Sequence, residues 1–176
     1  MMGKVEVIAP NSFLTEFLKT DLDWMQDALN LAEKAYSENE VPVGCIIVQN
    51  NKIIGKGYNQ TQSLKDPTAH AEVLAITAAA ASIKDWRLTD TAIYVTKEPC
   101  AMCAGAIINS RISKLIFGAY DEQKGCCGSL YQLCGDRRLN SRASSQGGIL
   151  EERCESLLKE FFLKQRKSSS GRLAEN

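Results

Sequence analysis

Strand-like and helix-like segments alternate between Thr91 and Tyr120. TAIYVT is a short run of apolar and β-branched residues, Pro99 interrupts the chain, CAMCAGAIINS is rich in small residues compatible with a helix, and KLIFGAY is again strand-like. A strand, a helix and a second strand in this order imply a crossover connection, which makes the two strands parallel. This alternation points to an α/β fold with at least one parallel pair of strands.

Further segments add an antiparallel hairpin and three helices. VPVGCIIVQ and KIIGKGYN flank Asn50 and Asn51, a dipeptide that tolerates positive φ, and they predict the two strands of a hairpin. Apolar residues at helical spacing predict amphipathic helices over residues 21–40 and 150–167, and the alanine-rich run after His70 predicts another. We therefore expect an α/β fold of three layers, α/β/α, with a mixed central sheet of about five strands.

The chain has 176 residues, which is enough for one domain with a full core and too few for two comfortable ones. Residues 1–20 show no clean hydrophobic period and are expected to form an N-terminal extension. Residues 21–167 are expected to form the domain, and residues 168–176 a flexible C-terminal tail. Within the domain, residues 121–149 are rich in Gly, Ser and Cys, so we expect mainly loop there, with a short helix near Leu130.

Charge and cysteine content bear on partners and on the cellular compartment. Lys plus Arg equals Asp plus Glu at 21 each, but residues 1–100 hold 9 basic and 13 acidic side chains, whereas residues 101–176 hold 12 and 8. The C-terminal part is therefore the expected side for a polyanion. The seven cysteines are an odd set, and the chain has neither a signal-like start nor a run approaching the roughly 18 apolar residues of a membrane helix. We expect a cytoplasmic protein with no membrane partner, whose reduced cysteines bind metal or are simply buried.

Cys100 and Cys103 are separated by two residues, and the chain has a single histidine, His70. The spacing lets two thiolates on one helical turn point at a common ion, and a helix start just after Pro99 favours the thiolate form. A CxxC pair alone is also compatible with a redox pair, half of a zinc finger or chance. Because no second cysteine pair stands at zinc spacing, these side chains predict one zinc ion per chain with an open position, where zinc activates a water.

Glu72 lies two residues beyond His70, so on a helix it points roughly 200° away from it and is not expected to bind the same ion. From the first turn of the helix its carboxylate can reach the activated water, take its proton and return it to a departing nitrogen. In the alternative interpretation His70 caps a helix, Glu72 is solvated and the cysteines are core residues. The joint occurrence of these residues favours the catalytic interpretation.

The run HAE at 70–72, together with PCAMC at 99–103, is similar to the signature of the zinc-dependent nucleobase deaminases. Beyond this signature, six further segments resemble the bacterial tRNA-specific adenosine deaminases, and the likeness runs from about Asp21 to about Lys167. These segments are VPVGCIIV, GYN, DPTAHAE, YVTKEPCAMCAGAI, SRI and FGAYDEQKGCCGSL. The resemblance implies a cytidine deaminase-like fold and a hydrolase that needs zinc and no organic cofactor.

The resemblance also implies a reaction and a partner. The reaction is the hydrolysis of adenosine to inosine at the wobble position of an arginine tRNA, whose anticodon loop is the expected partner. Members of the family are homodimers whose RNA groove uses both subunits, so a homodimer is expected. The implied ligands are His70, Cys100 and Cys103, with Glu72 as the proton shuttle. The implied substrate contacts are the side chain of Asn59, the backbone of Ala71, Val43 as a pocket wall, Asp121 near a sugar and Phe161 beside the anticodon loop.

The chain departs from the family pattern away from the zinc ligands. Lys97 replaces an apolar residue, Cys126 and Cys127 stand where small alanines are usual, and Ser141 stands where a histidine is common. These positions bear on how the chain holds RNA and on how the loop after Asp121 packs. A candidate phosphate-contacting set, whose members could equally be solvated or cap helices, comprises Arg137, Arg138, Arg142, Lys164, Arg166 and Lys167.

Two other functions remain open from the residues alone. A zinc-dependent deaminase of a free base, nucleoside or nucleotide, of the guanine or cytosine type, would share the same metal chemistry. A non-catalytic zinc-stabilised RNA-binding module would share the metal but not the role of Glu72. The basic C-terminal part and the FF-containing helix favour the RNA enzyme over the small-molecule enzyme.

Overall fold

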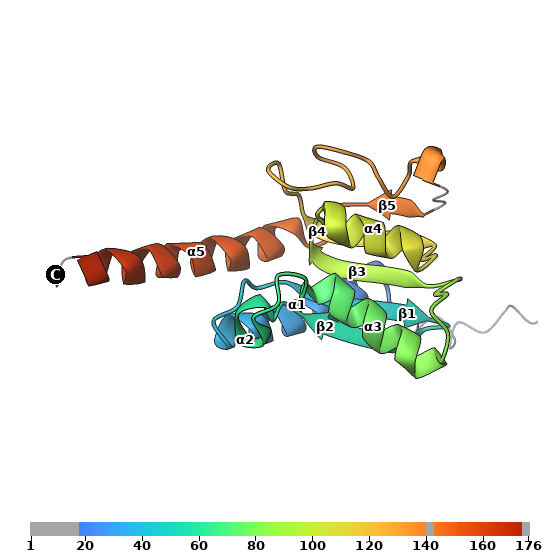
Figure 1. Cartoon of the computed structure of the whole chain (residues 1–176), viewed down its shortest axis with the longest axis horizontal. Helices are drawn as coiled ribbons and strands as arrows, with labels where there is room; N and C mark the ends of the chain where they lie inside the picture. Colours follow the sequence, from blue (N-terminus) through green and yellow to red (C-terminus); the bar gives the residue numbers. More distant parts are fainter. Residues whose placement is uncertain (1–17, 140–142, 174–176) are drawn as a thin grey trace, which may run out of the picture.

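The fold is a five-stranded mixed sheet between two helical layers (Figure 1). The computed structural model describes residues 18–139 and 143–173. The strands lie in the order β2-β1-β3-β4-β5, with antiparallel pairs on the β2 side and parallel pairs on the β5 side. Helices α3 and α4 lie over one face of the sheet, and α1 and the start of α5 over the other. The predicted three-layer α/β/α class is confirmed.

Helix α1 (Asp21–Ser37) begins at the predicted residue because Thr20 caps it. The Thr20 hydroxyl accepts a hydrogen bond from the Asp23 N–H, and the Asp23 carboxylate accepts one from the Thr20 N–H at 2.8 Å, which closes a capping box. The helix ends at Ser37, before the expected end at Glu40, with Glu38 as its C-cap. One face of α1 packs on the sheet and buries Trp24, Met25, Ala28, Leu29, Ala32 and Ala35.

The predicted hairpin consists of β1 (Gly44–Gln49) and β2 (Lys52–Tyr58), paired antiparallel. Asn50 and Asn51 form its turn with φ values of 50° and 57°, the positive φ that the Asn-Asn pair was expected to supply. Strand β1 is buried along almost its whole length because it lies between β2 and β3 and under helices on both faces.

Strand β3 (Ala92–Lys97), helix α4 (Ala101–Asn109) and strand β4 (Lys114–Ala119) form the predicted crossover, and the two strands pair in parallel. Helix α3 (Ala71–Ile83) packs on β2 very closely: a Cβ added at Gly57 would lie 2.2 Å from the backbone oxygen of Ala71. Glycine therefore lets the start of α3 approach the sheet. The starts of α3 and α4 lie next to each other, and this places the candidate site.

The structure differs from the expectation between β4 and the last helix. Strand β5 (Ser144–Gln146) adds a fifth strand parallel to β4, and a 3₁₀ helix, η2 (Arg137–Leu139), takes the place of the short helix expected near Leu130. At Leu130 itself the described chain forms a tight turn, bridged between Cys127 and Gln132. A short helix, α2 (Thr61–Leu64), was not predicted either, because four residues are too few to show a helical period.

Helix α5 (Glu151–Leu173) continues past the expected end at Lys167 and extends well beyond the sheet (Figure 1). The serines and the glycine that follow Lys167 disfavour a helix by only about 1 kcal/mol per residue or less, so they do not stop it. Residues 1–17 lie outside the described part, and the roles of the N-terminal extension and the tail stay predictions. Within residues 18–139 and 143–173, no helix has both the length and the apolar character needed to cross a bilayer.

Candidate active site

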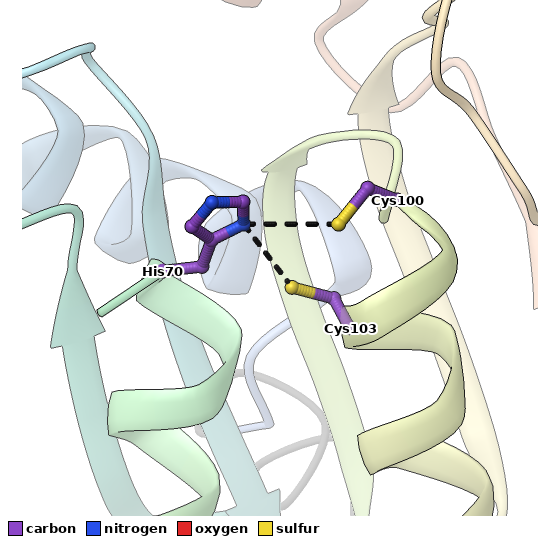
Figure 2. A group of neighbouring side chains, drawn as sticks. All are labelled: His70, Cys100 and Cys103. Atoms are coloured by element: carbon purple, nitrogen blue, oxygen red, sulfur yellow. Dashed lines mark hydrogen bonds between the residues drawn. The ribbon is translucent and has the colours of Figure 1, made fainter. Parts of the chain in front are cut away.

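The candidate site lies where α3 and α4 begin. His70 and Cys100 are the N-caps of these two helices, both with extended backbone, and Cys103 lies in the first turn of α4. Neither cap side chain bonds to its own helix, so the imidazole and the thiol are available to each other. Figure 2 shows the His70 ring and the two sulfurs converging from the two helix starts. The positive end of the α4 dipole favours thiolates there.

The three side chains have the geometry of a zinc site. His70 Nδ1 lies 3.4 Å from Cys103 Sγ and 3.7 Å from Cys100 Sγ (Figure 2), and all three donor atoms lie within 4.8 Å of one another. A tetrahedral zinc with Zn–N of about 2.0 Å and Zn–S of about 2.3 Å would hold N and S atoms about 3.5 Å apart. The residues present therefore fit the ion. Among the described residues no fourth His, Cys, Asp or Glu joins this group.

The three groups share protons, and only Cys100 favours the form that binds a metal ion. Hydrogen bonds from Cys103 and His70 lower the pKa of the Cys100 thiol to about 3, and the bond to Cys100 raises the pKa of the His70 imidazole. The same contact raises the pKa of Cys103, because its proton is shared with the neighbouring sulfur. A bound zinc ion would therefore displace the protons that His70 and Cys103 favour.

Glu72 lies in the first turn of α3 and is only 4% exposed. Burial raises the pKa of its carboxyl above the ordinary value, which brings it closer to the range in which a carboxylate can both take and return a proton. Its side chain lines the same cavity as His70 and Cys100, and it is not part of the three-residue group. The role of Glu72 as proton shuttle stays a prediction.

The cavity beside the three ligands has a volume of about 220 Å³. Three of the predicted substrate contacts, Val43, Asn59 and Asp121, line it. Ala71 is fully buried, and a contact of its backbone with a base stays a prediction. The remaining wall consists of Val41, Thr61, Lys97, Glu98, Lys124 and Phe162.

The structure separates Phe161 from its neighbour Phe162. Phe161 is 5% exposed and packs edge-on against Tyr36 at 5.9 Å between ring centroids, whereas Phe162 is 44% exposed and lines the cavity. Burial within the chain argues against a stacking role for Phe161 and favours Phe162. The two rings are adjacent on α5, so helical spacing shows only that one faces inward and not which one.

Buried acids around the cavity were missed by the sequence analysis. Glu98 accepts hydrogen bonds from the backbone N–H groups of Asp121, Cys127 and Ser129 and so shapes the loop that follows β4. Burial alone would raise the pKa of Glu98, but these hydrogen bonds outweigh burial and lower that pKa below its ordinary value. Glu40 plays a similar part after β2. No local pattern reveals such residues, because their partners lie far away in the sequence.

Two of the noted departures can also be placed. Lys97 forms an ion pair with Asp121 at the cavity, and Cys127 Sγ lies 3.5 Å from Cys134 Sγ in the buried loop. Ser141 and Arg142 lie outside the described residues. Of the candidate phosphate contacts, Arg138 pairs with Asp136 at 2.7 Å, which reduces its availability to a phosphate.

A family model described as the cytidine and deoxycytidylate deaminase zinc-binding region matches residues 18–119, the part that carries all three donors and Glu72. The chain is 42% identical over 144 residues to the tRNA-specific adenosine deaminase of Bacillus subtilis, spanning 82% of this chain and 89% of that protein. It is 44% identical over 147 residues to the protein of the same name from Haemophilus influenzae, spanning 83% and 85%.

Solved structures give a consistent result. A structure from studies of A-to-I editing by tRNA:A34 deaminases at the wobble position of transfer RNA is 34% identical, with a TM-score of 0.74, over 77% of this chain and 98% of that one. Guanine deaminase from Nitrosomonas europaea shares the fold with a TM-score of 0.73 at 22% identity, over 92% of this chain and 98% of that one.

Proposed function

Because the chain belongs to the cytidine and deoxycytidylate deaminase zinc-binding family and to its tRNA-specific adenosine deaminases, we propose that it hydrolyses adenosine to inosine in tRNA. The target is the wobble adenosine, and an arginine tRNA is the expected substrate, bound by its anticodon loop. One observation carries the proposal: three zinc donors and a buried carboxylate line or border one cavity at two helix starts. Action on tRNA implies a cytoplasmic enzyme.

His70, Cys100 and Cys103 would hold one zinc ion per chain. When bound, the zinc supplies an activated water as the nucleophile for C6 of adenine. Glu72 would carry the two protons of that water, one to ring N1 and one to the departing amino group, so that a C6–O bond replaces the C6–N bond, ammonia leaves and inosine remains. Val43 bounds the cavity on one side, and Asn59 offers an amide to the base. The buried setting of Glu72 keeps bulk water away from this proton transfer.

A homodimer is part of the proposal. Exposed apolar side chains occur on α4 and in the segment between β4 and β5, where Cys126 N–H donates to the Pro99 oxygen, next to the start of α4, at 2.9 Å. We propose that these side chains form one surface, because several exposed apolar residues together mark an interaction site. We define the α4 surface as Met102, Leu130, Tyr131 and Leu139, which are 36%, 51%, 64% and 46% exposed.

The test is turnover of defined substrates by the zinc-loaded protein. An arginine tRNA transcript with adenosine at the wobble position, the same transcript with guanosine there, free guanine and free cytidine are incubated separately, and the products are identified by mass spectrometry. We expect inosine only in the first. Turnover of the free compounds alone would show a small-molecule deaminase instead.

Glu72→Ala completes this experiment. Loss of the proton shuttle should lower tRNA turnover by about 10²-fold to 10⁴-fold while the zinc content stays at about one per chain. Glu33→Ala, which removes an exposed acid on α1, is the matched control and should turn over normally. Full activity of Glu72→Ala, with zinc content and fold intact, would show that the proton-shuttle role is wrong.

A further inference from the structure

Glu40 is a buried carboxylate that connects three parts of the chain. It lies between α1 and β1 and is 1% exposed. Its Oε1 accepts hydrogen bonds from the backbone N–H groups of Gln62 and Ser63 at 2.9 and 2.7 Å. Its Oε2 accepts from Asn59 Nδ2 and Thr61 Oγ1, both at 3.3 Å. Gln62 N–H also lies 3.2 Å from Oε2, so Oε1 serves backbone donors alone, whereas Oε2 serves this N–H and two side chains that line the cavity.

The bonds to Oε1 replace a missing helix cap. Gln60, the N-cap of α2, gives no side-chain hydrogen bond to its helix, and the Glu40 carboxylate satisfies two of the free N–H groups instead. Burial alone would raise the pKa of Glu40, but these hydrogen bonds outweigh burial and lower that pKa below its ordinary value. Glu40 is therefore a carboxylate at neutral pH. An ionised carboxylate only accepts hydrogen bonds. The group facing its Oε2 must therefore be a donor.

This requirement fixes the orientation of the Asn59 amide. Nδ2 lies 3.3 Å from both Glu40 Oε2 and Thr61 Oγ1, and these two oxygens are themselves 3.3 Å apart, so one amide hydrogen points between them. Among the described residues no side-chain nitrogen or oxygen is both buried and without a partner. Since Asn59 lines the cavity and its Oδ1 accepts no hydrogen bond from the described residues, that oxygen is open to the cavity.

We propose that Glu40 is a positioning residue that fixes the Asn59 amide with its carbonyl oxygen toward the cavity, where that oxygen accepts a hydrogen bond from an N–H group of the base. This inference rests on the proposed function, in which the base is adenine and the amino group at C6 is its N–H donor. A reversed amide would present a donor to that amino group, which would leave both unsatisfied. Glu40 thereby selects for bases that carry a hydrogen on this edge.

Glu40→Gln tests the orientation while sparing the helix cap. The oxygen of the new amide can keep both backbone N–H groups, but its NH₂ group now faces Asn59, whose own amide must turn to offer its oxygen to that NH₂. We expect kcat for the tRNA to fall by about 10-fold to 100-fold. KM should change less, because phosphate contacts elsewhere hold the tRNA. Zinc content should remain at about one per chain, and Glu38→Gln, an exposed neighbour, is the matched control.

A swap of the two groups restores the predicted arrangement. When Glu40→Gln is combined with Asn59→Asp, the amide now at position 40 donates to one oxygen of the carboxylate now at position 59. The other oxygen of that carboxylate faces the cavity, and the total charge is unchanged. We expect this double variant to recover to within about 5-fold of the wild type. Asn59→Asp alone places two carboxylates together and should be the least active of the three. A double variant no more active than Glu40→Gln would overturn the proposal, as would wild-type kcat in Glu40→Gln.

A readout independent of turnover separates this inference from the proposed function. In ¹⁵N–¹H spectra of the zinc-loaded protein, the side-chain amide hydrogen of Asn59 that faces Glu40 should exchange slowly with water in the wild type and quickly in Glu40→Gln. Fast exchange in the wild type would contradict the inference even if the tRNA is edited. Slow exchange in a protein that does not edit tRNA would support the Glu40 arrangement and refute the tRNA substrate. Should Glu40→Gln fold poorly, the double variant is compared directly with the wild type in turnover.

Discussion

Three side chains at the site are fit to hold an ion, and a fourth is fit to move a proton. The ligands come from two helix starts, where backbone N–H groups stabilise thiolates, and the nitrogen-to-sulfur distances of 3.4 and 3.7 Å suit tetrahedral zinc. Glu72 is held apart from them by its position in the first turn of α3 and by burial. Each role thus depends on where the residue lies in its helix as well as on its type.

Lys97 gives a test of charge at the edge of the cavity. Its ammonium pairs with Asp121. Burial alone would raise the pKa of the Asp121 carboxyl, but the pairing with Lys97 helps to lower that pKa. Lys97→Leu should leave an unpaired carboxylate beside the RNA and raise the KM for tRNA by about 5-fold, with a smaller change in kcat. Steady-state kinetics at several salt concentrations measure this, with Lys52→Leu, an exposed lysine on β2, as the control. A KM equal to or below that of the wild type would contradict the assignment.

At the residue scale, the metal donors could be predicted because two short motifs carry them. The supporting acids could not, since Glu40 bonds to Asn59 and to the backbone near Ser63, and Glu98 bonds to the loop up to Ser129. Such contacts form only when distant segments pack. Phe162 shows a related limit, because a helical period places two adjacent rings on neighbouring faces without deciding which one the sheet covers.

At the scale of elements, the crossover from β3 through α4 to β4 and the β1–β2 hairpin were predictable, because each is encoded by a local pattern. Strand β5 was not: Ser144 to Gln146 is short and polar, and its pairing with β4 makes it a strand. Helix α2 likewise depends on its contact with Glu40. Because such elements form only through contacts with other segments, their own residues show little helix or strand pattern.

Asp21 provides a test of how α1 is held to the sheet. It accepts hydrogen bonds from Tyr94 Oη at 2.6 Å on β3 and from Lys114 Nζ at 2.9 Å on β4. Asp21→Asn keeps the Tyr94 bond and loses the ion pair, which is more than one-third exposed and so stabilises by at most about 1 kcal/mol. We expect a Tm about 2–4 °C lower at pH 7, measured by calorimetry beside Glu33→Gln as the control.

The effect of Asp21→Asn should depend on pH. Burial alone would raise the folded-state pKa of Asp21, but the hydrogen bonds from Tyr94 and Lys114 outweigh burial and lower that pKa below 3.8. Its stabilising contribution is therefore complete well above pH 3.8 and is lost as the pH falls through the lower folded-state value. The difference in Tm from the wild type should be constant above about pH 5 and shrink toward about pH 3. A difference that grows on acidification would contradict the ion pair.

At the scale of the whole molecule, the sheet carries the site at one end, and α5 extends beyond the sheet with Phe162 at the cavity (Figure 1). Positive charge is concentrated in the C-terminal part although the net charge is zero. This distribution suits an enzyme that meets a polyanion on one side only. No local sequence pattern shows how many subunits form the RNA groove.

The α4 surface offers the corresponding test. Tyr131→Asp places a charge on the proposed α4 surface, and we expect a monomer in sedimentation equilibrium, whereas the wild type should be a dimer. Activity on tRNA should fall when the dimer is lost, because both subunits form the proposed RNA groove. Trp86→Asp, a similarly exposed aromatic residue after α3, should leave both properties unchanged. Dimers of undiminished stability in Tyr131→Asp would exclude this surface.

Three side chains of this chain would hold the zinc and leave one coordination position open. Zinc K-edge X-ray absorption on the purified, zinc-loaded protein measures this directly. We predict one zinc per chain, two sulfur neighbours at about 2.3 Å and two nitrogen or oxygen neighbours at about 2.0 Å, one of them from solvent. Three or more sulfur neighbours, a shell of six oxygens, or a protein that takes up no zinc would contradict the account.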